Sequence, residues 1–558
     1  MPQFGIFVKL AQAWYNRLVI QGDPYVGDMT LIQRKTQNPA YWGEEFTITP
    51  DDLQNLSTVL VEDELPRSAE DLGRALILDR CRQEEALIER AMSRGTPYQP
   101  KRGYKVGEQV VFPALGFRAA EVVGVRPGHN PEYGSFQVIR AKFEEGGERE
   151  FASELETDHP LNDEAQTSVA GGVEQHAADE LATLYSPQVG AMLAKHLESE
   201  SDFVRLAGKW FRRDLLVEVH VGHLNLAEAV LDMAGGGPLP TEDLLGDLEL
   251  PEEITPQLRV FSLNYALQED ERFDEVGPAG EVLWFLRRME PERVQSIPVR
   301  LQYQPLEYDP ALLTSEMLAL EQELDDEWSN LGSPAEIKDP LTVILTYPHW
   351  RSGTLPLSSQ LARVFPTGRT RRIRFSLIDG ESGAEMPAWV VREGHYIYGL
   401  GEWYRENDVP PGAYLELARG EKPGTAVIQR RGRRPRREWV RVALPIEGQL
   451  TFEVRKQLIA CEYDELMIVA EEDPAAMDIV WARAHKQELS LNRLITEIFP
   501  ELAKLSPQGT VHAATLYSAV NVAMRTPPGP LLAELVVSDA YAPVGDNYWV
   551  LHAGSTGV

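Results

Sequence analysis

The residues in this sequence best suited to chemistry are arginines, whose guanidinium groups could bind phosphate. Six of them lie within residues 430–437 of the segment QRRGRRPRREWVR, namely Arg430, Arg431, Arg433, Arg434, Arg436 and Arg437. A guanidinium donates paired hydrogen bonds to phosphate oxygens and releases counterions from nucleic acid. Because Gly432 and Pro435 break any helix here, we expect an extended arm or loop.

A second arginine group lies upstream, in the segment GRTRRIRF. Its members are Arg369, Arg371, Arg372 and Arg374. Residues 363–441 hold 16 Arg and Lys against 10 Asp and Glu, a net charge of +6 in a chain that carries −32. The remainder of the chain therefore carries −38. These arginines suit phosphate contacts, but they could also neutralise the protein's own acidic surface or bind an acidic partner.

Common catalytic motifs are absent from the sequence. It contains no GxxxxGK[ST], HExxH, GxSxG, GxGxxG or calcium-loop pattern. The nearest approach to metal-ligand spacing is His220 and His223 in HVGH, and no further ligand lies nearby, whereas a usable site needs three or four. We therefore expect no enzymatic activity, no cofactor, no metal and no small-molecule substrate.

Length and composition indicate several globular domains. The chain has 558 residues, of which 43% are hydrophobic and 25% charged. Its charge of −32 repels phosphates and anionic membranes from the average surface, though not from a local basic patch. Two cysteines, Cys81 and Cys461, fit a reducing compartment, and neither a membrane-spanning run nor a secretory signal is evident. We expect a cytoplasmic, nucleoid-associated protein.

Hydrophobic periodicity, turns and charge divide the chain into eight segments. They are a mainly helical region (1–98), a small β-barrel (99–160), an acidic linker and helical region (161–203), a winged helix (204–290), a connecting helix (291–335), an open pseudobarrel with the arginine strip (336–445), a small β unit (446–483) and a second winged-helix-like domain (484–558). This pattern predicts an α+β multidomain protein.

Two helices with apolar faces are predicted outside the β-rich segments. The first spans residues 68–92, and its candidate core residues are Leu72, Leu76, Leu78, Cys81 and Leu87. Upstream of it, TPDDLQNL carries an N-cap signal for the start of another helix. In residues 310–330, a short heptad seam is formed by Leu313, Met317, Leu320 and Leu324. Such a seam is typical of a helix that docks between domains.

The strands expected in residues 104–160 resemble the SH3-like barrels of transcription-associated proteins. The likeness rests on VGEQVVFPALG, a following strand and RPGHNPEYGSF. Such barrels bind proteins as often as nucleic acids, and a packing module is the alternative. Within the acidic segment that follows, LNDEAQTSVAGGVEQ is predicted to be a solvated linker.

Residues 204–290 have the pattern of a winged helix. A first helix, a Gly/Pro turn, a second helix capped by Thr241 and a third helix precede the strands ERFDEV and EVLWFL, which GPAG joins. The segment resembles the HARE helix-turn-helix family, related to the N-terminal domain of the RNA polymerase delta subunit. The matching residues are Leu263, Leu267, Asp270, Arg272, Phe273, Val276, Gly277, Trp284 and Leu286. The resemblance implies a place in transcription or chromatin-like machinery, with RNA polymerase or another protein as partner, and does not imply DNA contact.

Residues 341–441 resemble the B-three DNA-binding fold, an open pseudobarrel of plant transcription factors and restriction-enzyme effector domains. The order expected is strand, arm, strand and short helix, then a hairpin around Asp379-Gly380, then strand, helix, turn and strand. The matching residues are Leu355, Pro356, Ala362, Asp379, Gly383, Trp389, Tyr396, Gly401, Trp403, Tyr404, Asn407, Val409 and Gly412. Ala413 departs from the family, which usually has an acidic residue there.

The B-three family grips the major groove of duplex DNA with two arms, and the resemblance implies which residues form them here. One arm would hold His349, Trp350, Arg351 and Ser352, and the other Arg392, Glu393, Gly394 and His395. Arginine can contact guanine with two hydrogen bonds, and serine or histidine can contact phosphate or base edges.

The C-terminal region is expected to hold strands VRVALPI, QLTFEV and DELMIVA, and then a diverged second winged helix at about 484–554 with Asp546 and Asn547 in its wing turn. We therefore predict a non-enzymatic DNA-binding factor associated with transcription or the nucleoid. An acidic protein-binding scaffold of the transcription apparatus is the alternative, and a restriction-related effector protein is a third reading.

Overall fold

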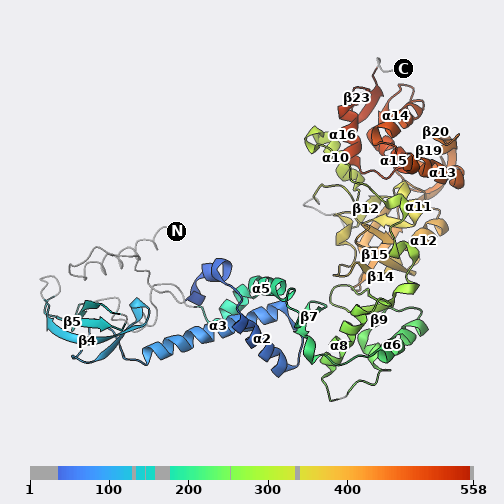
Figure 1. The fold of residues 1–558 in the computed structure, drawn as a ribbon. Coiled ribbons are helices and arrows are strands. Elements are labelled where there is room, and N and C mark those ends of the chain that lie inside the picture. The colour runs from blue at the N-terminus through green and yellow to red at the C-terminus, as the bar shows by residue number, and fades with distance from the viewer. Residues whose placement is uncertain are drawn as a thin grey trace. The chain divides into compact units, whose positions relative to one another are not determined.

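The computed structural model describes residues 35–128, 134–144, 146–157, 176–251, 253–332 and 340–552 (Figure 1). The chain forms two compact units, residues 1–217 with 253–261, and residues 218–252 with 262–558. Helices mix with six separate sheets in the described part, so the predicted α+β class is confirmed. No helix within these ranges is long and apolar enough to cross a membrane.

Two helices of the first unit begin where the sequence signals predict, α2 (Pro50–Asp63) and α3 (Ala69–Met92). A third, α5 (Ala178–Leu197), follows the residues outside the described ranges. Thr49 caps α2 and Ser68 caps α3, each in a reciprocal capping box. The prediction of Leu87 as a core residue is wrong: its exposed fraction is 66%, because α3 buries no residue beyond Cys81.

Two sheets accompany these helices. The larger has the order β2-β3-β4-β5-β6 and comprises Thr96–Pro97, Gln109–Phe112, Arg118–Pro127, Gln137–Phe143 and Glu148–Ser153. Stacked aromatic side chains, Tyr98 and Phe112 among them, form its core. The smaller sheet joins β1 (Arg67–Ser68), β8 (Lys209–Arg212) and β7 (Phe203–Leu206). The predicted linker, residues 161–175, lies outside the described residues.

Elements in the predicted winged-helix order follow along the chain. These are α6 (Val221–Met233), β9 (Leu239–Pro240), α7 (Thr241–Leu245), α8 (Pro256–Glu269), β10 (Phe273–Glu275) and β11 (Leu283–Leu286). The predicted wing strands β10 and β11 pair with each other, and β9 completes the sheet. Thr241 does not cap α7: the cap position is Pro240, and the Thr241 hydroxyl instead lies between Asn264 and the indole nitrogen of Trp284.

A curled sheet of seven strands forms the half-barrel of the second unit. Its order is β12-β17-β18-β14-β15-β16-β13, and its strands are Leu341–Ile344, Tyr414–Arg419, Thr425–Arg430, Arg372–Asp379, Glu385–Val391, Tyr396–Tyr398 and Thr354–Pro356. All neighbours are antiparallel except β14 and β18. Every second residue of β14 is buried, as its alternating sequence requires. The predicted hairpin at Asp379 and the helix α12 (Gly401–Glu406) are present.

A long hairpin leaves the half-barrel toward the C-terminus. Its strands are β19 (Gly432–Ile446) and β20 (Gln449–Cys461), and β21 (Ile468–Glu471) pairs with β19 from Arg441 onward. Side chains on its two faces pack into two different cores. Val442 packs into the half-barrel core, whereas Ala443 packs into the core of the C-terminal module.

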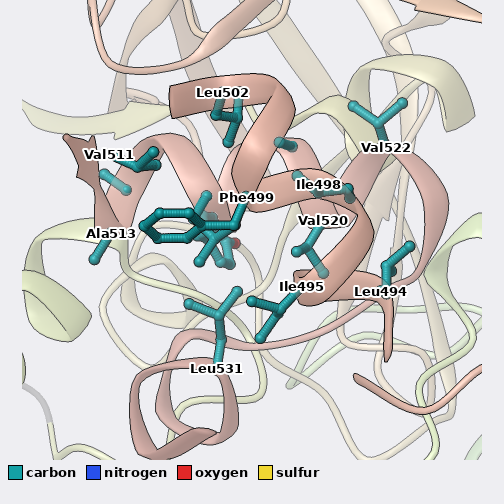
Figure 2. Packing of buried hydrophobic residues seen from close by; sticks show 14 of the residues in the cluster. Leu494, Ile495, Ile498, Phe499, Leu502, Val511, Ala513, Val520, Val522 and Leu531 are labelled. Carbon is teal, nitrogen blue, oxygen red and sulfur yellow. The ribbon is translucent and has the colours of Figure 1, made fainter. Parts of the chain in front are cut away.

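The C-terminal module repeats the strand order of the first winged-helix-like module. After α13 (Pro474–Lys486) come α14 (Leu491–Ala503), β22 (Val511–His512), α15 (Ala513–Ala523), α16 (Pro528–Val537), β23 (Tyr541–Gly545) and β24 (Tyr548–Leu551). Its sheet order is β22-β24-β23, equivalent to β9-β11-β10. Phe499 lies amid the buried side chains (Figure 2). The four predicted seam residues join the same core, three of them from α10 (Ser315–Leu324) and Leu313 from the segment before it.

Candidate nucleic-acid interface

The segment of the first predicted arm forms a short helix, α11 (Tyr347–Ser352), between β12 and β13. Pro348 occupies the first turn, and Gly353 ends the helix with a φ of 65° in the left-handed region. The side chain of His349 is 1% exposed, with Nδ1 2.9 Å from Thr354 Oγ1 and Nε2 3.2 Å from Glu327 Oε1. Neither ring nitrogen of this histidine reaches the surface.

The other members of this predicted arm also contact protein groups. Arg351 lies 3.0 Å from Asp478 and 3.4 Å from Glu471, both contributed by the C-terminal part of the chain. The two carboxylates outweigh burial and raise the pKa of Arg351. Trp350 donates its indole hydrogen bond to a backbone carbonyl, and Ser352 is buried. Helix α11 therefore joins parts of the second unit.

The second predicted arm is the turn between β15 and β16. Arg392 extends from it but donates to the carbonyl oxygens of Gly368, at 2.8 Å, and Thr370, at 3.3 Å. His395 adopts a φ of 55°, and its ring packs 4.6 Å from the ring of Trp328. The turn is thus present where predicted, with both of its candidate contact residues already engaged by neighbouring groups.

The upstream arginine group divides into exposed and engaged members. Arg369 and Arg371 are exposed, and Arg371 pairs loosely with Glu393. Arg372 is shared by Glu290 at 2.7 Å and Asp274 at 3.0 Å. These ion pairs connect β14 to the first winged-helix-like module inside the second unit, so Arg372 acts structurally.

Glu290 and Arg374 show how burial changes the charges beside β14. Burial, reinforced by the neighbouring charge of Asp274, raises the pKa of Glu290 to about 8 despite its contact with Arg372. Burial lowers the pKa of Arg374, whose guanidinium lies 5.3 Å from the centre of the Trp389 ring. Arg374 therefore packs within the protein instead of facing solvent.

The arginine strip itself also divides. Arg430 ends β18 and contacts Glu381 at 3.2 Å, while Arg431 lies 3.4 Å from Glu416 and 3.3 Å from Glu462. These two arginines are neutralised by the protein's own carboxylates, as one of the two sequence hypotheses proposed.

The remaining arginines of the strip lie on the hairpin. Arg434, Arg436 and Arg437 are exposed, and within the described residues none of them has an ion-pair partner. Gly432 pairs with Cys461 and Arg436 pairs with Ile459, so the three residues 433–435 of β19 oppose the single residue Ala460 of β20. Arg434 falls in this bulge, and bulges re-aim side chains away from a regular ladder.

We call residues 433–441 of β19 with 454–459 of β20 the basic ribbon. Its ladder aligns Arg437 with Leu458 and Trp439 with Lys456 on one face. Trp439 and Leu458 are each 66% exposed, and Lys456 is also exposed. The Lys456 ammonium lies 5.9 Å from the centre of the Trp439 ring. Cations and an open aromatic surface thus lie side by side.

Trp439 was not a candidate site residue in the sequence prediction. The signal was available, because the alternation of RREWVRV places Arg437, Trp439 and Arg441 on one face of any strand. Only the pairing with β20 shows that this face stays open at Trp439 while it becomes covered at Ala443.

Histidine and acidic residues are also candidate metal ligands. In the described part of the chain, no three His, Cys, Asp or Glu side chains gather in a way that could hold a metal ion. His220 and His223 stack their rings 3.7 Å apart at the start of α6, where His220 accepts a hydrogen bond from the backbone of Gly222. They behave as capping residues.

Comparison of this chain with protein-family models, with curated proteins and with solved structures gave no match. The resemblances to the B-three, HARE and SH3-like families therefore stay predictions.

Proposed function

We propose that this protein is a non-enzymatic DNA-binding factor that contacts duplex DNA through the basic ribbon. The observation that carries the proposal is the set of three exposed, unpaired arginines on the ribbon, Arg434, Arg436 and Arg437. Most of the other candidate cations are already held by protein groups. A major groove about 12 Å wide accepts a two-stranded β ribbon.

Electrostatics favour a local contact over a broad one. The chain carries −32, so phosphates are repelled from most of its surface and attracted only where cations gather. The ribbon supplies such a place, since Arg434, Arg436 and Arg437 have no ion-pair partner among the described residues, although Arg455 is held by Glu453 and Glu472. We propose that it holds the DNA backbone, and that transcription or nucleoid organisation is the setting.

The fold of the second unit supports a finer proposal. We propose that the half-barrel is a B-three-type domain in which the ribbon, and not the two arms, contacts the DNA groove. We also propose that the modules before and after it are winged helices. In the C-terminal module, α16 occupies the place of a recognition helix, yet Leu531, Leu532 and Leu535 bury it in the core. This burial favours protein packing over DNA reading for that module.

The test is a salt titration of full-length protein on fluorescent duplex DNA. Replacing Arg434, Arg436 and Arg437 with glutamine should weaken binding and reduce the salt slope by about 0.9 for each phosphate that is no longer neutralised. A matched control replaces Arg405, Arg493 and Lys504 with glutamine, so its net charge changes as much as that of the ribbon variant. Their side chains are 76%, 66% and 66% exposed.

The control separates a local contact from a general effect of charge. Equal weakening by both triple variants would contradict the ribbon as the contact site. The absence of wild-type binding at low salt would favour the alternative, an acidic scaffold that binds protein. The full chain is required, because a fragment ending at residue 445 would separate β19 from β20.

A further inference from the structure

The most exposed tryptophan of the described residues lies among cations. Trp439 is 66% exposed, and on the same face of the ribbon the ladder places Arg437, Lys456 and Leu458 beside it. The next pair on this face is Arg441 with Val454, so these six positions include no acidic residue. Each of the three pairs on this face therefore joins one cationic and one apolar side chain.

Such a face fits a ligand with a flat apolar part joined to anions. Every nucleobase has a π face that stacks on an aromatic side chain, and its flanking phosphates match nearby cations. Bases inside an intact duplex are already stacked on one another and cannot lie flat on an indole. A base outside the stack, in a gap, bulge or single-stranded junction, can do so.

We propose that Trp439 is a stacking platform for an unpaired base, with Lys456 and Arg437 holding the adjacent phosphates. The inference rests on the proposed function and deepens it, because it names DNA with unpaired bases as the preferred ligand. Lys456 lies 5.9 Å from the ring centre and leaves part of the indole open, since the ring remains 66% exposed. The platform thus exists before the ligand arrives and needs no rearrangement.

The experiment compares a labelled duplex with the same duplex carrying a short single-stranded gap, using full-length protein and fluorescence anisotropy. Wild type should bind the gapped DNA about 5- to 100-fold more tightly, the range expected for stacking one base. Trp439→Ala should remove this preference and keep the affinity for intact duplex within about twofold, while Trp439→Phe should retain most of the preference.

Leu458→Ala is the matched control, because Leu458 is equally exposed on the same face and has no π system. It should leave the preference unchanged. The fluorescence of Trp439 itself is obtained by subtracting the spectrum of Trp439→Phe from that of wild type. The gapped DNA should quench this fluorescence, and the intact duplex should not.

The outcomes separate this inference from the proposed function. Equal binding of both DNAs by wild type, still weakened by the arginine substitutions, would overturn the stacking platform and leave the duplex contact standing. No binding of either DNA would overturn both. A concentration-dependent dimer that Trp439→Ala disperses would assign this face to a second copy and also overturn the inference.

Discussion

Replacing Arg525 with methionine should destabilise the C-terminal part of the second unit in a strongly pH-dependent way. Its guanidinium lies 2.7 Å from Asp326 and 2.7 Å from Glu327, and all three side chains are 1–2% exposed. Burial alone would raise the pKa of Glu327, but the charges of Arg525 and His349 hold it well below its usual range. Methionine preserves most of the volume of the arginine and removes only its charge and hydrogen bonds.

The magnitude follows from what the two carboxylates can do afterwards. Asp326 keeps the Tyr517 hydroxyl at 2.7 Å and the backbone N–H of Trp328 at 3.0 Å as donors, and Glu327 keeps His349 at 3.2 Å. The least costly response is to protonate one carboxyl, which at pH 7 takes about 3.7 kcal/mol for an ordinary glutamate and at pH 5 about 1 kcal/mol. The first value agrees with the roughly 3–5 kcal/mol lost when a buried pair is broken.

The pH dependence of wild type and that of the variant both make the stability difference between them larger at higher pH. In wild type the depressed pKa of Glu327 contributes stability above the unfolded value, and that contribution is lost as pH falls. In the variant the unpaired carboxyl prefers its proton, so stability is lost as pH rises. The difference between the two proteins therefore grows from pH 5 to pH 7.

Differential scanning calorimetry of the full chain at both pH values measures this difference. The relevant transition should fall by about 7–15 °C at pH 7 and by about 2–4 °C at pH 5. Arg493→Met, at a position 66% exposed, should shift it by less than about 3 °C. The reasoning would be refuted by equal losses at both pH values, or by a wild-type melting point at pH 7. Adding Asp326→Asn and Glu327→Gln to Arg525→Met should recover most of the loss.

Two further predictions concern other parts of the fold. Because burial raises the pKa of Glu290 from 4.5 to about 8, the folded state holds the extra proton between these values and stability should fall as pH rises through them. Glu290→Gln should flatten that slope in melting temperature, and an unchanged slope would contradict the assignment. Gly190→Ala should lower the melting temperature of the first unit, because its Cβ would lie 2.8 Å from the carbonyl oxygen of Ala69 and the cost of overpacking, about 1–3 kcal/mol, exceeds the helix-propensity gain of about 1 kcal/mol. Gly246→Ala, which meets only Asp243 at 3.6 Å, is its control.

Local signals predicted the elements whose cause lies within a few residues. The capping box of Ser68 begins α3, and the alternation of β14 places every second side chain inside. The wing turn at Asp546 and Asn547 also forms as expected, with φ values of 47° and 59°, because these two residue types tolerate the left-handed region.

Whether a candidate side chain is free to contact DNA could not be predicted, because that depends on carboxylates that lie far away in the sequence. Arg372 is held by Asp274 and Glu290, and Arg351 by Glu471, far away in the sequence. Helix α11 had local signals in Pro348 and Gly353, but the expectation of an arm came from the family pattern and overrode them.

The ribbon invites a plainer explanation, that its charges only protect an edge from aggregation. Arginine, lysine and proline all blunt exposed strands, and the ribbon has all three. Protection of an edge works with charges of either sign and needs no exposed indole. Trp439, at 66% exposure, does nothing to keep an edge soluble. In a chain of −32, carboxylates would protect the edge more consistently with the rest of the surface. A triple glutamine variant that stays soluble and loses DNA binding separates the two explanations, since protection alone predicts aggregation first.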